Sequence, residues 1–403
     1  MQRPMQHKFA AVLVALSAAL LAVQAQAESS PAWAGIWRGT LGRYPITVCL
    51  QQGGADDYFG AYYYEKRLRI ITLHNEQEER DPSRLHFVES DAMPKKADKN
   101  AKAASATSKA KDTYAKWELQ MPSGDNLQGR FSATSDPTLP IVLHRVSDAA
   151  STCGSPAFTG PLHQEYRIDA GKPKGAEPYF GAALDFGKES TYQVSGFQLN
   201  ASDAASVKIN LGLMKALRQE GDNAMECRNN MLDSNGYLGD YSSTTEPALL
   251  TPHWLVARTT ESDDCGGAHP NASLHFVTWD RTPGWQVDPW TWLTPSAVKR
   301  TRKDVGSGTT YTENEVLPAL QKLLARHWPR DDADCNDTIT SASDWQVHPG
   351  LHGLIFTPDL PHVIFACTED DEIPYAEIAP LLNATGREAV KAIQAEPGAL
   401  EKR

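Results

Sequence analysis

Residues 35–50 read GIWRGTLGRYPITVCL and contain two runs of strand-forming residues. The first run begins at Gly35, and the second, PITVCL, ends at Leu50. Runs rich in β-branched and aromatic residues that are bounded by Gly or Pro are typical of strands in a hairpin. The stretch therefore predicts an antiparallel hairpin near the start of the chain.

The same pattern recurs at residues 60–73, which begin GAY, and at residues 129–143, which begin GRF. Similar spacing from a glycine to a closing leucine indicates repeated hairpins. We therefore expect residues 31–147 to form an antiparallel β meander or a barrel-like domain. An aromatic row within it either fills both faces of a strand or lines a ligand groove; its members are Tyr58, Phe59, Tyr62, Tyr63 and Tyr64.

The first 27 residues have the layout of a secretory signal. Arg3 and Lys8 precede an apolar run, FAAVLVALSAALLAV, which leads to the cleavage-site pattern AQA at residues 25–27. A retained membrane anchor is the alternative, but the run is short for a membrane span. We predict a signal peptide over residues 1–27, a periplasmic location in a Gram-negative bacterium, and no membrane span after cleavage.

Six cysteines follow this signal: Cys49, Cys153, Cys227, Cys265, Cys335 and Cys367. An even number in an oxidising compartment predicts disulfides, although sequence alone leaves the connectivity open. Zinc is the competing interpretation, but no two of these cysteines form a C-x-x-C pair. We favour bridges between sequence neighbours: Cys49 with Cys153, Cys227 with Cys265, and Cys335 with Cys367.

The chain is acidic, with a formal net charge of −11. This balance argues against nucleic acid and anionic membranes as partners, because both require clustered Lys and Arg. It is compatible with a cationic partner, or with acidity that only maintains solubility. The positive charge gathers in residues 91–116, a Lys/Ala-rich segment with few large apolar residues, which we expect to be a mobile insertion. An anionic glycan or lipid is the alternative explanation for its lysines.

A Gly/Pro-rich linker over residues 148–178 precedes a second domain over residues 179–385, and residues 386–403 form a C-terminal helix and tail. The fold class is therefore α+β, with helices packed on an antiparallel sheet. One helix is expected on an apolar face formed by Val207, Leu211, Met214 and Leu217, and it should end at Gly221. A second is expected after a Thr312–Glu315 capping box, although Pro318 would kink it or move its start, and a third after a Thr385–Glu388 capping box. Strands are expected at residues 250–260, 274–280, 351–357 and 362–368.

One motif raises the question of catalysis: Cys265-Gly266-Gly267-Ala268-His269-Pro270. His269 with Asp280 is the candidate catalytic pair if the chain is an enzyme. No G-x-S-x-G, S-x-x-K or H-E-x-x-H motif supplies a nucleophile or metal for that histidine to serve. We therefore favour a turn that enters a strand, in which His269 hydrogen-bonds locally. No cofactor or metal is predicted, because an incomplete calcium-loop pattern at residues 233–236 has Thr244 where the closing Glu belongs.

Tryptophan is concentrated after this motif. The stretch PGWQVDPWTWLTP at residues 283–295 has a loop-like composition, and it holds Trp285, Trp290 and Trp292. Tryptophan suits both interface anchoring and sugar stacking. These three residues, with His269, are the candidate binding residues, and core packing is the alternative for each.

The order of motifs in residues 179–385 resembles an exported domain of unknown function. That domain occurs in the C-terminal half of a lysozyme-sensing anti-sigma factor and beside the catalytic domain of some peptidoglycan deacetylases. The matching positions are Ile209, Asn210, Gly266, Gly267, Ala268, His269, Pro270, Asp280, Ile373, Pro374 and Tyr375. The extra cysteines and the Trp-rich segment depart from the pattern.

The resemblance implies binding rather than catalysis. The expected partner is a protein of the cell envelope, specifically a cationic cell-wall hydrolase such as lysozyme, towards which the chain would act as inhibitor, sensor or immunity-type protein. A peptidoglycan-modifying enzyme centred on His269 and a peptidoglycan-binding module are the alternatives.

Overall fold

The structure is a computed structural model. It describes residues 30–54, 57–75, 83–90, 115–133, 137–147, 151–162, 166–173, 175–187, 192–267, 269–306, 308–328, 335, 342, 344–395 and 400–401. The signal peptide predicted over residues 1–27 lies outside these residues, as does nearly all of the insertion predicted over residues 91–116.

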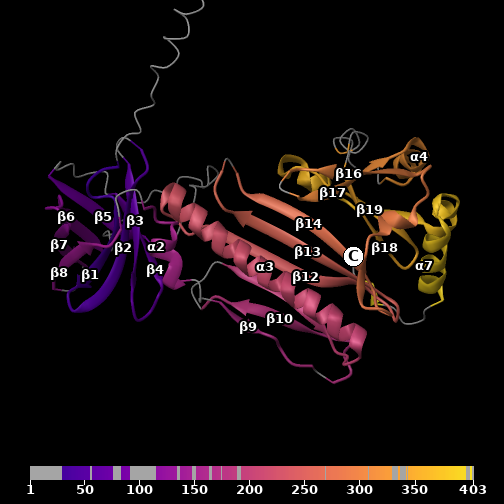
Figure 1. Ribbon diagram of the computed structural model, residues 1–403, viewed down its shortest axis with the longest axis horizontal. Helices are drawn as coiled ribbons and strands as arrows, with labels where there is room; N and C mark the ends of the chain where they lie inside the picture. The colour runs from indigo at the N-terminus through magenta and orange to yellow at the C-terminus, as the bar shows by residue number, and fades with distance from the viewer. Residues whose placement is uncertain are drawn as a thin grey trace, which may run out of the picture.

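The N-terminal part is a closed barrel of eight antiparallel strands, which confirms the barrel-like prediction (Figure 1). The strands are β1 (Gly35–Leu41), β2 (Tyr44–Gln52), β3 (Tyr58–Tyr64), β4 (Ile70–Asn75), β5 (Arg84–Ser90), β6 (Lys116–Gln120), β7 (Asn126–Ser132) and β8 (Leu139–Arg145). Each strand pairs with the next, and β1 pairs with β8 to close the barrel. A Cβ at Gly39 would collide with the carbonyl oxygen of Val142, so glycine permits the close approach at this seam.

The aromatic row of β3 divides between the two sides of the barrel wall. Tyr58, Tyr62 and Tyr64 pack with the core inside the barrel. Tyr63 packs outside it, where its hydroxyl donates a 3.2 Å hydrogen bond to the carbonyl of Phe158. The outer side is buried because α2 (Pro156–Thr159) and η1 (Gly160–Leu162) lie near it.

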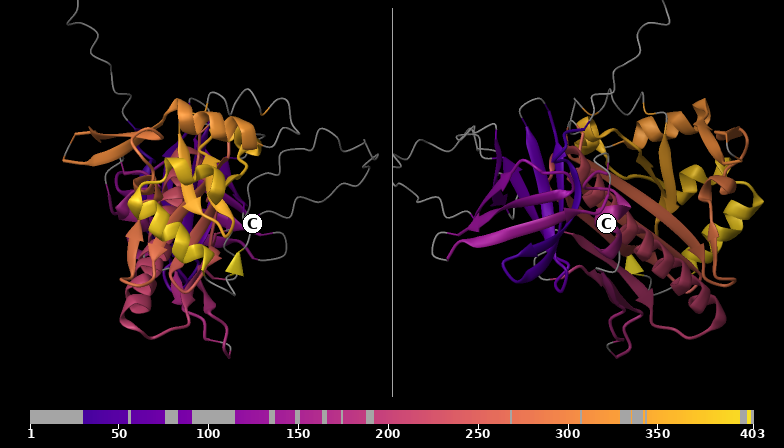
Figure 2. Two further views of the ribbon diagram at one scale, coloured as in Figure 1. Left: turned by 90° about the vertical axis from the view of Figure 1, so that its right-hand side faces the viewer. Right: turned by 60° about the vertical axis from the view of Figure 1, so that its left-hand side comes forward.

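A mixed sheet at the centre of the molecule follows the barrel. Its strands are β9 (Arg167–Asp169), β10 (Tyr179–Asp185), β11 (Gln193–Leu199), β12 (Asp240–Leu250), β13 (Trp254–Asp264), β14 (Asn271–Asp280) and β15 (Trp285–Val287), with β21 (Leu400–Glu401) paired to β12. Neighbours are antiparallel except β11 and β12, which are parallel because a helix connects them. The barrel lies at one end of this sheet (Figure 2).

That connecting helix is α3 (Ala204–Asn235), with 32 residues. Asp203 caps its start by accepting hydrogen bonds from the amides of Ala205 and Ser206, and Gly236 ends it with φ of 72°. The prediction that it ends at Gly221 is wrong. A Cβ at Gly221 would collide with Leu184 and Tyr166, so this glycine permits close packing on the sheet and does not end the helix. No helix among the described residues has the length and hydropathy to cross a membrane.

The predicted apolar face of α3 is only partly correct. Leu217 is buried, but Val207 and Leu211 are exposed. The buried stripe instead runs through Ile209 and Leu213, which meet the sheet. Two stripes of similar spacing overlap in this sequence, and the register against the sheet decides between them.

The C-terminal region packs against the far end of the sheet (Figures 1 and 2). Its elements are η2 (Pro289–Trp292), β16 (Val298–Asp304), β17 (Thr310–Val316), α4 (Pro318–His327), β18 (Trp345–Pro349), β19 (Gly353–Pro358), η3 (His362–Cys367), β20 (Asp371–Pro374), α6 (Tyr375–Ile378), η4 (Ala379–Leu381) and α7 (Ala384–Gln394). The α+β class is confirmed for the chain after the barrel.

Three local predictions in this region are wrong. Thr312 lies in β17 and caps no helix; α4 begins at Pro318, the alternative start, because proline suits the first turn of a helix and the preceding polar run pairs as a hairpin. Residues 362–367 form the 3₁₀ segment η3 and not a strand. Asn383, not Thr385, caps α7, through a 3.0 Å bond from the amide of Gly386.

The three disulfides are Cys49–Cys153, Cys227–Cys265 and Cys335–Cys367, which is the pairing predicted from sequence order. The first joins the barrel to the segment before α2. The second joins α3 to the end of β13. Disulfides are typical of exported proteins.

Candidate functional site

The histidine motif forms the turn between β13 and β14. Gly266 and Gly267 have φ of 97° and 108°, a region that disfavours residues with a Cβ. His269 is exposed, and its Nδ1 lies 2.9 Å from the carbonyl oxygen of Pro270. A carbonyl oxygen only accepts, so the imidazole donates. This solvent-exposed bond contributes about 1 kcal/mol or less to stability.

The candidate catalytic pair is not brought together. His269 precedes β14, whereas Asp280 is the last residue of that strand. Ten residues of extended chain separate their positions by roughly 30 Å. Asp280 instead accepts a 2.9 Å hydrogen bond from the amide of Thr282. It therefore cannot orient the imidazole of His269.

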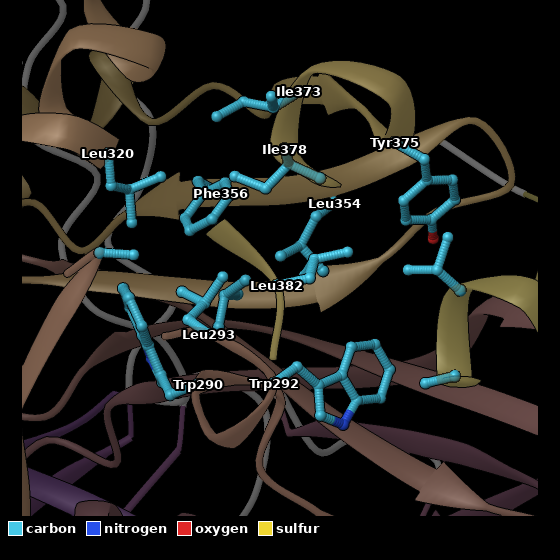
Figure 3. Packing of buried hydrophobic residues seen from close by; sticks show 14 of the residues in the cluster. Trp290, Trp292, Leu293, Leu320, Leu354, Phe356, Ile373, Tyr375, Ile378 and Leu382 are labelled. Atoms are coloured by element: carbon cyan, nitrogen blue, oxygen red, sulfur yellow. The ribbon is translucent and has the colours of Figure 1, made fainter. Parts of the chain in front are cut away.

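The three candidate tryptophans differ in exposure. Trp285 is 64% exposed, whereas Trp290 and Trp292 are 5% and 1% exposed. The predicted contact surface is therefore wrong for Trp290 and Trp292, which lie inside the C-terminal core (Figure 3). Their segment, despite its loop-like composition, forms the short helix η2. The ring of Trp290 packs against Phe356, and the ring of Trp292 packs against Trp254.

A further surface, not predicted from the sequence, lies on the side of the central sheet that carries α3. The helix crosses this side over β11 and β12, and β13 and β14 extend beside it (Figure 1). Residues that pair directly across an antiparallel ladder point to the same side of the sheet. Two such rows of side chains therefore share this side with α3. One row is Tyr241, Asp263 and Asn271, and the other is Ser243, Glu261 and Ser273.

One hydrogen bond joins this side of the sheet to α3, and a second lies between two strands of the sheet. The Tyr241 hydroxyl donates a 2.6 Å bond to Glu220 of the helix. The Ser273 hydroxyl lies 3.5 Å from Glu261 and donates to it. We call the group formed by Glu220, Tyr241, Glu261, Asp263, Ser273 and His275 the acidic sheet face.

Electrostatic repulsion is present on the acidic sheet face. Burial raises the pKa of the Glu261 carboxyl, and the negative charges of Glu220 and Asp263 raise it further. His275 and the Tyr241 hydroxyl lower the pKa of Glu261 and offset part of this shift. The pKa of Tyr241 is raised by burial and by its bond to Glu220, so its hydroxyl remains a donor.

No cation of the described chain pairs with the two central carboxylates. None of the ion pairs among described residues includes Glu220 or Glu261. Their partners are hydroxyl groups. Elsewhere on α3, the exposed Asp222 accepts a 2.9 Å hydrogen bond from the Tyr166 hydroxyl, and Arg228 is buried. The carboxylates of Glu220, Glu261 and Asp263 make the acidic sheet face suited to contact with positive side chains.

Sequence signals for the acidic sheet face are weak. The alternation of Glu261 and Asp263 along β13 indicates that they share one side of a strand. The approach of Glu220 depends on the path of α3 over the sheet, which sequence spacing does not give. Within the described part of the chain, no group of three or more His, Cys, Asp or Glu side chains is arranged to hold a metal ion.

Comparison with known proteins finds no matching family model and no matching curated protein. Two solved structures that are similar to part of the chain are DUF3298 family proteins. The structure from Pseudomonas aeruginosa is 14% identical in sequence, and the match covers 54% of this chain and 92% of that protein's chain with a TM-score of 0.33. The structure from Bacteroides fragilis is 13% identical in sequence, and the match covers 57% of this chain and 98% of that protein's chain with a TM-score of 0.35.

Proposed function

We propose that this chain is a non-catalytic periplasmic binding protein that recognises a cationic cell-wall hydrolase of the lysozyme type through its acidic sheet face. The observation that carries the proposal is the pair Glu220 and Glu261, two carboxylates whose charges repel each other and with which no described Lys or Arg forms an ion pair. The net charge of −11 and the three disulfides support an exported protein with a cationic partner.

Repulsion between these carboxylates favours binding of a cation. A lysine or arginine of the partner, placed between Glu220 and Glu261, would neutralise charges that now oppose each other. Charge-assisted hydrogen bonds of this kind are stronger than bonds between neutral groups. Complementary charge also accelerates encounter between proteins, and salt screens this effect.

The test measures binding of the protein without its signal to a panel of lysozyme-type hydrolases at low and high salt. We expect salt-sensitive association. The double variant Glu220→Gln/Glu261→Gln should weaken binding by roughly tenfold, because it removes both charges and keeps the shape of the side chains.

The matched control is Glu313→Gln/Glu315→Gln, which changes net charge equally on the β16–β17 hairpin, where Lys303 and Lys299 pair with these residues. Equal loss of binding in both double variants would show that only total charge matters. Absence of binding to every enzyme of the panel at low salt would refute the proposal, and sedimentation with peptidoglycan then tests the glycan alternative.

A further inference from the structure

One end of the barrel gathers aromatic side chains around a carboxylate. At this end β1, β3, β5 and β7 finish and β2, β4, β6 and β8 begin. We call it the barrel mouth and define it by the residues that line its interior: Tyr44, Tyr62, Tyr64, Glu89, Trp117 and Phe131. Tyr44, Tyr64 and Phe131 are partly or fully exposed, whereas Tyr62 and Trp117 are buried beneath them.

Two donors fix the orientation of the carboxylate. The Tyr62 hydroxyl donates a 2.6 Å hydrogen bond to Oε1 of Glu89, and the Trp117 indole donates a 3.0 Å bond to the same oxygen. In the described part of the chain the Glu89 carboxylate has no other hydrogen-bond partner and no ion pair. The charge of a half-buried carboxylate is therefore balanced by neutral donors alone.

Further aromatic rings pack outward from the two side chains that bind this carboxylate. The rings of Tyr62 and Trp117 are 4.8 Å apart between centroids, and those of Tyr62 and Tyr64 are 5.6 Å apart. Tyr44 meets Tyr64 edge-on at 6.0 Å, and Phe131 meets Trp117 edge-on at 6.4 Å. Burial raises the pKa of Tyr62 and of Tyr64, and the charge of Glu89 adds to both shifts.

Aromatic faces and a carboxylate attract the same kind of ligand. The face of an aromatic ring is negative and attracts cations, and groups of such rings recognise ammonium ligands. A carboxylate adds direct charge attraction, which is strong where water is partly excluded. A hydrogen-bond network that only closed the barrel would need neither a charge nor exposed tyrosines.

We propose that the barrel mouth is a binding site for an organic ammonium group, held by Glu89 and by the partly exposed ring of Tyr64, above the buried rings of Tyr62 and Trp117 that position the carboxylate. This site is separate from the acidic sheet face and independent of the proposed function.

The experiment is a ligand titration followed by 19F NMR on the whole protein labelled with 5-fluorotryptophan. The resonance of Trp117 is assigned with the variant Trp117→Phe, because the chain has 10 tryptophans. The probes are choline, a free quaternary ammonium, and Nα-acetyl-lysine amide, which presents a lysine side chain as a peptide would. The neutral isostere of choline, 3,3-dimethylbutanol, tests the role of charge.

We expect saturable shifts of the Trp117 resonance with at least one ammonium probe, and the responding probe identifies the source of the group. Glu89→Gln should weaken binding by about tenfold, and Tyr64→Leu should weaken it several-fold. The matched control is Glu118→Gln, which removes a carboxylate that pairs with Arg84 and Arg130. Glu118 neighbours Trp117 in β6 and so points to the other side of the barrel wall.

Three outcomes would overturn the proposal. They are no response to either ammonium probe, equal binding of the neutral isostere, and equal weakening by Glu89→Gln and Glu118→Gln. Thermal melts of each variant show that the barrel is folded. If Glu89→Gln unfolds it, Tyr64→Leu at the rim and the neutral isostere still decide the question.

Discussion

Asp371 allows a quantitative prediction of how stability depends on pH. This residue of β20 is 1% exposed, and neither carboxyl oxygen has a hydrogen-bond partner. Burial raises the pKa of Asp371 from 3.8 to about 7, and His327 offsets only part of the shift. The folded state therefore binds the proton more tightly than the unfolded state does.

The sign follows from linkage between folding and proton binding. Between pH 3.8 and about 7 the folded state holds more protons than the unfolded state, so the free energy of unfolding falls as pH rises. At 1.36 kcal/mol per pKa unit, the ionised carboxylate destabilises the fold by about 4 kcal/mol above pH 7. Below the unfolded pKa this cost is absent.

The variant Asp371→Asn removes the ionisation and keeps a polar side chain of similar shape. We expect stability close to that of the unmodified protein at pH 4, and a gain that grows towards about 4 kcal/mol at pH 8. Denaturant unfolding followed by tryptophan fluorescence reports on this region, because Ile373 of the same strand packs in the cluster that holds Trp290 and Trp292.

The control is Asp359→Asn, which removes an exposed carboxyl from the turn after β19 and changes net charge equally. It should leave the dependence of stability on pH unchanged. If the difference between Asp371→Asn and the unmodified protein is constant from pH 4 to pH 8, the reasoning about this carboxyl is wrong.

Two further predictions concern the disulfide of α3 and the tryptophans. Replacing Cys227 and Cys265 by serine opens a loop of sequence separation 38 and should cost about 4 kcal/mol in denaturant unfolding; a loss below 1 kcal/mol would contradict this estimate. Trp292→Ala should cost about 3 to 5 kcal/mol, because it empties a fully buried site, whereas Trp285→Ala should leave the melting temperature unchanged. Only Trp285→Ala is expected to reduce hydrolase binding or sedimentation with peptidoglycan while the melting temperature stays the same. Such an effect in Trp292→Ala alone would contradict the assignment of Trp285 as the exposed contact residue.

The barrel could be predicted from sequence because its hairpins are local. In residues 35–50 the two strands and their turn are contiguous, and the alternation of side chains sets the pairing Ile36 with Cys49. Closure between β1 and β8 depends on a contact between Gly39 and Leu143, far apart in the chain, and no local pattern specifies it.

Residue exposure in the second part of the chain was harder to predict. Trp290 and Trp292 follow prolines and polar residues, which suggested an exposed loop, yet a 3₁₀ turn places both rings inside the core. Val207 and Leu211 fit an apolar helical stripe, yet a stripe rotated around α3 meets the sheet. In both cases periodicity gives the element, and only tertiary packing gives the buried side.

The junction between barrel and sheet determines how the two proposed sites are related. The end of α3 is held by a 2.6 Å bond from Gln51 of the barrel to the carbonyl of Asp233, and by a 3.0 Å bond from the amide of Gly154 to its carboxylate. His74 of the barrel stacks on Tyr237 at 4.2 Å, just beyond the helix. These contacts, with the Cys49–Cys153 disulfide, attach the barrel to the helix that carries Glu220.

A rigid attachment has a consequence for binding. Because α3 contributes Glu220 to the acidic sheet face and also anchors the barrel, a partner on that face meets a surface whose position relative to the barrel is fixed. A ligand at the barrel mouth lies inside the barrel and away from α3, so it should not change the affinity of the acidic sheet face. Coupling between the sites would require the junction at Asp233 and Tyr237 to move, and the contacts there oppose such movement.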